Sequence, residues 1–262
     1  MKKRLAVVVS GWHYPLHFYK SIANQYLPSN WEMDLFCIAH RDPNPTEAKA
    51  YLKKLGRNRR AKLDRLLYKK IATIKDIEKL GFKYVLEPNT IGDWGNSNQW
   101  LEKNDYTKYD LFLFTHDDNL ILNYQLIHNV VESSDYENWL ILCNSTGMPS
   151  GNIRGSFEFF KKEMLDKIGG KFDLSQTKLT REGHTENPQD RNELFDWNST
   201  VYPLRDFLQK YDLQSKVQAL SPAYRVSMYC IEGERGFISQ THGINTAEEE
   251  KGLDILAHYK MI

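Results

Sequence analysis

Short apolar runs that alternate with amphipathic segments are the feature that most constrains the fold of this chain. Leu5–Val9 is a continuous apolar run that ends at Ser10-Gly11, which is typical of a strand buried on both faces. Similar, largely apolar runs occupy residues 33–39, 82–86, 110–114 and 139–143. Because strands separated by helices pair in parallel, this alternation predicts an α/β fold with a mostly parallel sheet flanked by helices.

The pattern changes after about residue 150. Residues 157–168 are predicted to form a helix that ends at Gly169-Gly170, and residues 173–200 are polar and poor in aliphatic side chains. A segment of that length is too long for a simple turn, so we expect a functional loop region there. Since no internal repeat or low-complexity linker interrupts the chain, we expect a single domain over residues 1–262.

The charge balance argues against a general attraction to nucleic acid. The chain has 35 basic and 34 acidic residues and a net charge of +1, so we expect no nucleic-acid partner. Cys37, Cys143 and Cys230 are far apart in apolar segments, which favours buried, reduced thiols. With no apolar stretch long enough for a transmembrane helix, we expect a cytoplasmic protein.

One local segment departs from this balance. Residues 49–62 contain seven lysines and arginines and no acidic residue. Such a run is either a solvated helical face or a patch for anionic lipid headgroups, and the sequence leaves both interpretations open. The second interpretation predicts a peripheral membrane contact.

Two adjacent carboxylates, Asp117 and Asp118, follow the apolar run at 110–114. Open α/β sheets bind ligands in the crevice beyond the carboxyl ends of their strands. Because neighbouring buried anions repel each other, a divalent cation that bridges to a phosphate is a common solution. Asp and Asn also favour helix N-caps and turns, so the segment alone leaves that alternative open.

The segment Thr115-His-Asp-Asp-Asn119 resembles the Asp-x-Asp motif of GT-A glycosyltransferases, especially those of family 2. In that family the motif follows an apolar strand and holds the Mn²⁺ or Mg²⁺ ion that bridges the pyrophosphate of a nucleotide-sugar. The resemblance implies that Asp118 contacts the metal and that Asp117 faces the ribose or the metal's water ligands. This chain departs from the motif because no second Asp lies two positions after the first.

A second segment, Ser156–Asp173, resembles the acceptor-side segment of the same family, in which a strand and a helix end in Gly-Gly-x-Phe-Asp. An amphipathic helix with a glycine C-cap is the alternative interpretation. Together the two segments imply a GT-A-like, Rossmann-type sheet. The resemblance divides it into a nucleotide-sugar-binding half over 1–122 and an acceptor-side half over 123–262.

Weaker similarities extend the nucleotide site. The resemblance places Ser10, Gly11 and Trp12 under the nucleotide, and it places the loop 89–98 near the base and ribose through Asn89, Gly95 and Asn96. Ordinary turn chemistry explains both segments equally well. His242, in Gln240-Thr-His-Gly243, is a candidate late metal ligand, with a solvated or core histidine as the alternative.

An inverting glycosyltransferase also needs a general base for the acceptor hydroxyl. The resemblance places Asp190 in that position, with Glu193 and Glu186 as rivals and surface charge as the alternative. The sequence therefore predicts a metal-dependent transfer of sugar from a nucleotide-sugar to a hydroxyl of a glycan or lipid-linked acceptor. A nucleotidyltransferase and a non-catalytic nucleotide- or glycan-binding module remain alternatives.

Overall fold

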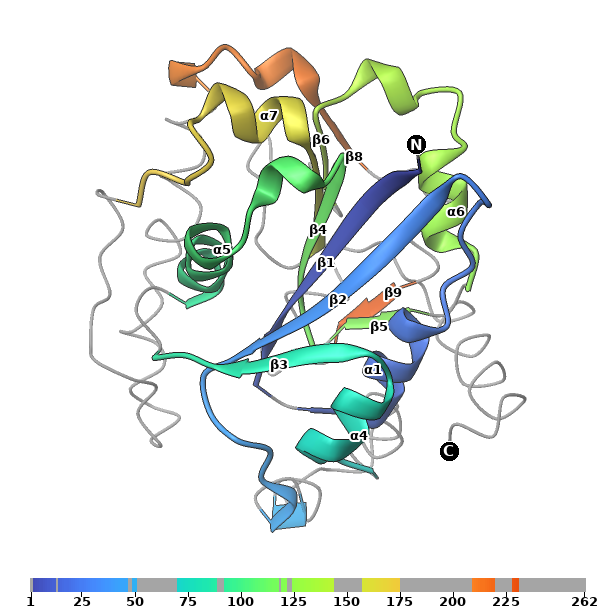
Figure 1. The fold of residues 1–262 in the computed structure, drawn as a ribbon, viewed down its shortest axis with the longest axis vertical. Helices are drawn as coiled ribbons and strands as arrows, with labels where there is room; N and C mark the ends of the chain where they lie inside the picture. Colours follow the sequence, from blue (N-terminus) through green and yellow to red (C-terminus); the bar gives the residue numbers. More distant parts are fainter. Residues whose placement is uncertain are drawn as a thin grey trace.

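A seven-stranded sheet forms the centre of the computed structural model (Figure 1). The structure describes residues 2–12, 14–46, 49–50, 70–88, 92–117, 119–121, 124–143, 157–174, 209–219 and 228–230. The strands of the sheet are β1 (Lys3–Gly11), β2 (Trp31–Ala39), β3 (Phe82–Leu86), β4 (Leu111–His116), β6 (Ile141–Cys143), β7 (Phe157–Lys161) and β8 (Val217–Ala219). The described helices are α1 (Leu16–Ala23), α4 (Ile74–Lys79), α5 (Gly92–Lys103), α6 (Leu126–Val131) and α7 (Lys162–Lys167), with 3₁₀ turns at Tyr106–Lys108, Tyr136–Asn138 and Gln214–Lys216.

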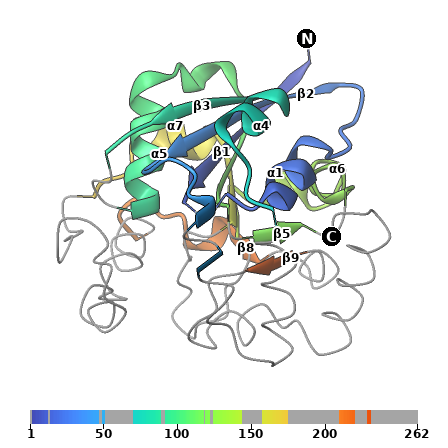
Figure 2. The same cartoon turned by 90° about the horizontal axis from the view of Figure 1, so that it is seen from below.

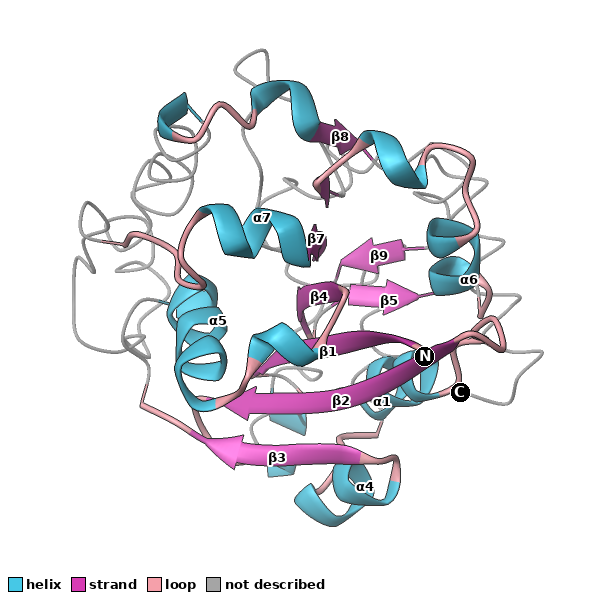
Figure 3. Ribbon diagram, turned by 45° about the horizontal axis from the view of Figure 1, so that its top comes forward, coloured by secondary structure: helices cyan, strands magenta, loops and turns pink. Residues whose placement is uncertain are grey.

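The strand order is β3-β2-β1-β4-β7-β6-β8. Among these seven strands only β7 runs against its neighbours, β4 and β6, and the other described pairings are parallel. The prediction of a mostly parallel sheet flanked by helices is confirmed. Two further strands, β5 (Asn119–Ile121) and β9 (Met228–Cys230), form a small antiparallel ribbon, whose arrows point in opposite directions in Figure 3.

Helices cover both faces of the sheet (Figure 2). Leu5, Val7 and Val9 of β1 join the core that contains the buried side chains of α1, α4 and α6. Ala6 and Val8 point to the opposite core, which contains side chains of α5 and α7. Because successive side chains of a strand alternate between the faces, two apolar layers require the uninterrupted apolar runs seen in the sequence.

Local signals set the ends of the short helix α4. The Thr73 hydroxyl accepts a hydrogen bond from the Asp76 backbone N–H at 3.2 Å, and the Asp76 carboxylate accepts one from the Thr73 N–H at 3.0 Å. This reciprocal capping box satisfies two backbone donors at the start of the helix. Gly81, with φ of 91°, follows the last turn and lets the chain enter β3.

The predicted helix over 157–168 is wrong in its first part. Residues Phe157–Lys161 form β7, and the helix α7 begins only at Lys162. The five strand residues are all buried, and their side chains alternate, with Phe159 in one core and Phe160 in the other. Pairing with β4 and β6 on both sides therefore decides the conformation.

None of the described helices is long and apolar enough to cross a bilayer.

Candidate functional site

The parallel strands end together at one edge of the sheet. The register pairs Gly11 with Ala39 and Ser10 with His116, so the last residues of β1, β2 and β4 lie side by side. The chain leaves β1 toward β2 and later returns from β3 through α5 to β4, so the strand order reverses between β1 and β4. Such a reversal opens a crevice at the carboxyl ends of the two strands, where α/β proteins bind ligands.

Asp117, the first residue after β4, joins the two strands at this reversal. Its side chain is fully buried, and its Oδ2 accepts hydrogen bonds from the backbone N–H groups of Trp12 (2.9 Å) and Tyr14 (2.7 Å). The hydroxyl of Tyr19 in α1 donates to the same oxygen at 3.2 Å. The structure thus turns this oxygen toward the connection between β1 and α1, while the predicted contact of Asp117 with a ribose or metal-bound water stays a prediction.

The connection that Asp117 holds has an unusual backbone. Tyr14 has φ of 58°, in the left-handed region, where a non-glycine residue costs about 1–3 kcal/mol. Its carbonyl accepts from the Ala72 N–H at 2.7 Å, and its hydroxyl lies 3.1 Å from the Gly11 carbonyl oxygen and also contacts that of Arg41. A Cβ at Gly11 would lie 2.8 Å from the sulfur of Cys37, so this position requires glycine.

Burial raises the pKa of several ionisable groups next to the strand reversal. It raises the pKa of the Cys37 thiol to about 12, and the nearby Asp117 carboxylate adds to this effect. Desolvation, followed by the charge of Asp117, likewise raises the pKa of Tyr14 and of Tyr19 well above the ordinary range. These hydroxyls therefore stay protonated and serve as hydrogen-bond donors at physiological pH.

An aromatic and cationic pair lies at the ends of β1 and β2. The Arg41 guanidinium stacks 4.2 Å from the centre of the Trp12 ring, and its Nε donates to the Trp12 carbonyl oxygen at 3.1 Å. The His40 ring meets the same indole edge-on at 6.4 Å. Sequence reasoning named Trp12 but missed Arg41 and His40, although they follow the apolar run 33–39 at the same edge.

The predicted nucleotide loop 89–98 is helical from Gly92, where α5 begins. Gly95 and Asn96 are buried within this helix, and the Asn96 amide donates to the Ile38 carbonyl at 3.4 Å. Residues 92–98 are therefore part of a helix instead of a loop, and Asn96 of this helix contacts the end of β2. Whether Gly95 and Asn96 contact a nucleotide stays a prediction.

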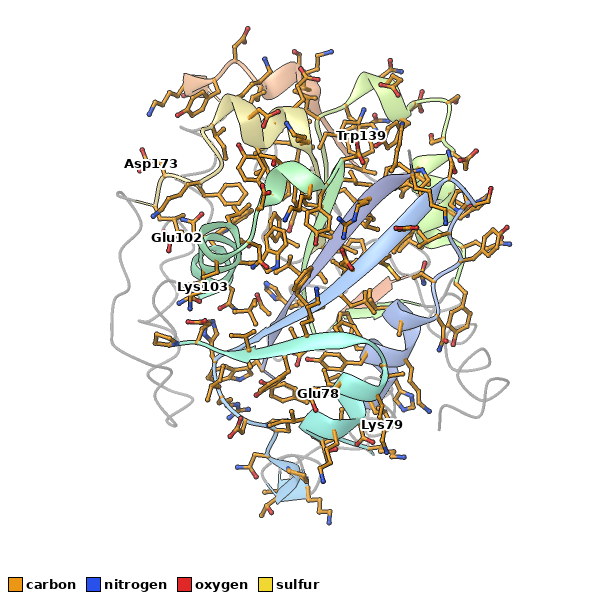
Figure 4. All side chains as sticks on the ribbon, viewed as in Figure 1. Glu78, Lys79, Glu102, Lys103, Trp139 and Asp173 are labelled. Atoms are coloured by element: carbon orange, nitrogen blue, oxygen red, sulfur yellow. The ribbon has the colours of Figure 1, made fainter. Side chains whose placement is uncertain are left out.

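The Gly-Gly-x-Phe-Asp segment packs against α5 and β4. The Phe172 ring lies 4.9 Å from that of Trp94 and 6.0 Å from that of Phe114. Gly169 and Gly170 both have positive φ, as a glycine C-cap requires. Asp173 follows at the surface, on the same side of the molecule as Glu102 of α5 (Figure 4).

Several predicted residues lie outside the described part of the chain. They are Asn89, Asp118, Glu186, Asp190, Glu193 and His242, together with residues 51–62 of the basic segment. Among the residues that the structure describes, no group of three or more His, Cys, Asp or Glu side chains is placed to hold a metal ion. The metal site and the general base therefore stay predictions.

Comparisons with family models and with curated proteins give no match for this chain. Similar solved structures include the mannosyltransferase PcManGT from Pyrobaculum calidifontis in complex with GDP-Man and Mn²⁺. It is 13% identical over 98% of this chain and 70% of its own, with a TM-score of 0.46. S. aureus TarS 1-349 in complex with UDP is 15% identical over 97% of this chain and 70% of its own, with a TM-score of 0.44. The glycosyltransferase GlyE of Streptococcus pneumoniae is 8% identical over 86% of this chain and 46% of its own, with a TM-score of 0.42.

Proposed function

We propose that this protein is a glycosyltransferase that takes its sugar from a nucleotide-sugar donor. The observation that carries the proposal is the packing of Phe172 on Phe114, three residues before Asp117. This contact brings together the two segments that the sequence relates to the acceptor and donor sides of GT-A enzymes. Transfer between two substrates requires such an approach, because the reacting atoms must be held close together.

The carboxyl ends of β1 and β4 support the donor side of this proposal. Trp12 is a half-buried aromatic side chain next to the strand reversal, and Arg41, stacked on its ring, adds a permanent positive charge. An aromatic face stacks on a nucleotide base, and a guanidinium pairs with phosphate oxygens. The combination suits a nucleoside diphosphate that lies across the ends of β1 and β4.

The proposal also assigns the metal ligands and the general base of the reaction. Asp118 and His242 would hold Mn²⁺ or Mg²⁺, which would supply a counter-charge for the diphosphate leaving group. Asp190, ahead of Glu193 and Glu186, would accept the proton of the acceptor hydroxyl in an inverting reaction. The acceptor would be a hydroxyl of a glycan or of a lipid-linked sugar, with residues 49–62 at the membrane surface of the cytoplasm.

The decisive assay uses the purified full chain with Mn²⁺ or Mg²⁺ and a panel of UDP-, GDP- and dTDP-sugars. Chromatography then measures the nucleoside diphosphate released, with and without a mixture of glycan acceptors. Asp118→Ala tests the site, and Glu78→Ala is the matched control because it removes an exposed carboxylate from α4 (Figure 4). We expect release by the wild type and by Glu78→Ala, and its loss in Asp118→Ala.

Two further incubations of the same protein, one with a nucleoside triphosphate and a sugar 1-phosphate and one that measures nucleotide-sugar binding, separate the alternative functions. Pyrophosphate formed from a nucleoside triphosphate and a sugar 1-phosphate would identify a nucleotidyltransferase. Nucleotide-sugar binding without turnover under all of these conditions would identify a non-catalytic module. Either result would reject the proposed transferase.

A further inference from the structure

The buried Asp117 carboxylate links the ends of β1 and β4, the two strands between which the strand order of the sheet reverses. The β4 end supplies Asp117, and the connection after β1 supplies the backbone donors of Trp12 and Tyr14. The Asp117 N–H also donates to the Ser10 carbonyl at 3.2 Å, so the two chain segments are joined in both directions. Among the described residues, this buried carboxylate oxygen accepts hydrogen bonds from the N–H groups of Trp12 and Tyr14 and from the Tyr19 hydroxyl, so it holds protein groups in place.

The hydrogen bonds of Asp117 connect further to the stacked pair of Trp12 and Arg41. Trp12, whose N–H donates to Asp117, accepts the Arg41 Nε at its own carbonyl. Tyr14, whose N–H donates to the same carboxylate, contacts the Arg41 carbonyl through its hydroxyl. Two short hydrogen-bonded paths therefore run from Asp117 to Arg41, one through Trp12 and one through Tyr14.

The backbone conformation of Tyr14 explains why a strong hydrogen-bond acceptor is needed at this position. Tyr14 keeps a left-handed backbone only because its surroundings over-determine that conformation. The 2.7 Å bond from its N–H is the shorter of the two backbone bonds that Asp117 accepts. Because this one oxygen accepts the N–H groups of both Trp12 and Tyr14, its hydrogen bonds offset the strain.

We infer that Asp117 is a positioning residue, which holds Trp12 and Tyr14 in the arrangement that receives a nucleotide and does not itself touch the ligand. The assignment of the ligand rests on the proposed function, whereas the fastening of Trp12 and Tyr14 does not. The inference separates the roles of the two adjacent aspartates. Asp117 holds protein groups in place, and Asp118 is the carboxylate that we propose faces the ligand.

Hydrogen exchange in the full chain without ligand tests the fastening. In Asp117→Asn and Asp117→Ala we expect the Trp12 and Tyr14 amides to exchange at least about tenfold faster than in the wild type, with the amides of β2 unchanged. Tyr19→Phe keeps the ring and removes one of the three donors, so it provides a milder variant that retains the two backbone bonds. Unchanged exchange at Trp12 and Tyr14 in both Asp117 variants would overturn the inference.

Asp110→Asn is the matched control. Asp110 precedes the same strand β4 and accepts the backbone N–H of Arg4 in β1 at 2.8 Å, so it makes a comparable link at the opposite edge of the sheet. We expect this control to leave the Trp12 and Tyr14 amides and the nucleotide affinity at wild-type values. Faster exchange at Trp12 in Asp110→Asn would show a general loosening of the sheet instead of a local role.

Calorimetry with UDP, GDP and their 2′-deoxy and 3′-deoxy analogues, each with Mg²⁺, separates positioning from direct contact. We expect Asp117→Asn to weaken each ribonucleotide and its deoxy analogues by the same factor, about tenfold or more. A loss confined to the ribonucleotides would show that Asp117 contacts a ribose hydroxyl and would overturn the inference. If the wild type bound none of these nucleotides, the proposed function would fail, while the exchange experiment would still decide the fastening.

Discussion

Asn98 and Phe172 are joined by two reciprocal hydrogen bonds: the Asn98 amide donates to the Phe172 carbonyl, and the Phe172 N–H donates to the Asn98 side-chain oxygen, both at 2.9 Å. This pair fixes the Gly-Gly-x-Phe-Asp segment to α5, and both residues are buried. A single side chain therefore ties the predicted acceptor-side segment to the helix beside the predicted donor site.

Asn98→Ala removes both bonds and leaves two buried backbone groups of Phe172 without these partners. We expect the free energy of unfolding to fall by roughly 2–6 kcal/mol, since each of the two unsatisfied buried groups costs about 1–3 kcal/mol. Urea denaturation measures the change. Asn104→Ala, which removes one bond from the residue after α5 to the Trp100 carbonyl in that helix, is the control and should cost about 1 kcal/mol. Equal losses in the two variants would contradict the special role of the Asn98 pair.

We expect an alanine substitution to destabilise the protein by different amounts at the adjacent glycines Gly169 and Gly170. Both have positive φ, near 73° and 74°, but a Cβ at Gly169 would meet no atom of the described residues within 4 Å, whereas one at Gly170 would clash with the Tyr106 ring. We expect Gly169→Ala to cost about 1 kcal/mol for the backbone alone. Gly170→Ala should cost about 1–3 kcal/mol more because the ring must move. Equal thermal denaturation midpoints for the two variants would refute the close contact.

The capping box of α4 gives a stability effect that depends on pH. Hydrogen bonds from the Thr73 backbone and side chain lower the pKa of Asp76 below its ordinary value of 3.8. A carboxyl whose pKa is depressed by folding stabilises the protein above its unfolded pKa, and this contribution is lost as the pH falls through the folded pKa. We therefore expect Asp76→Asn to be less stable than the wild type at pH 7, with the difference shrinking below about pH 4. Thr73→Ser should keep the cap, and Thr73→Ala should cost about 1 kcal/mol. A pH-independent difference between Asp76→Asn and the wild type would exclude the ionised cap.

Arg41 provides a test of the donor site that is independent of the metal. Arg41→Ala should weaken UDP or GDP binding about tenfold, equivalent to about 1.4 kcal/mol, because both the charge and the stack on Trp12 are lost. Lys83→Ala is the matched control, since it removes a cation of β3 that lies 5.0 Å from the centre of the Phe36 ring on β2. Calorimetric titration compares the two variants. Equal affinities in Arg41→Ala and the wild type would remove Arg41 from the site.

The sequence predicts the central strands well because their burial on both faces leaves a continuous apolar run, as in Leu5–Val9. It fails at Phe157–Lys161, where an apolar stretch of this kind suits a helix or a strand and only pairing with β4 and β6 decides. The general position of the site follows from the carboxyl edge of the sheet, which is a rule of topology.

Individual roles at that edge depend on contacts between residues far apart in the chain. Asp117 lies 105 positions from Trp12, and no local pattern shows that its oxygen accepts that N–H. Arg41 could have been found by applying to the end of β2 the rule applied to the ends of β1 and β4. For the predicted residues beyond the described ranges, the sequence resemblance remains the basis of their assignment.

The most direct test of the account is a crystal structure of the full chain with Mn²⁺ and a nucleotide-sugar that it binds. The account predicts a nucleoside that stacks near Trp12 and Arg41, with its diphosphate beside Asp118 at the carboxyl ends of β1 and β4. A nucleotide-sugar bound at any other edge or face of the sheet, with this crevice empty, would contradict it.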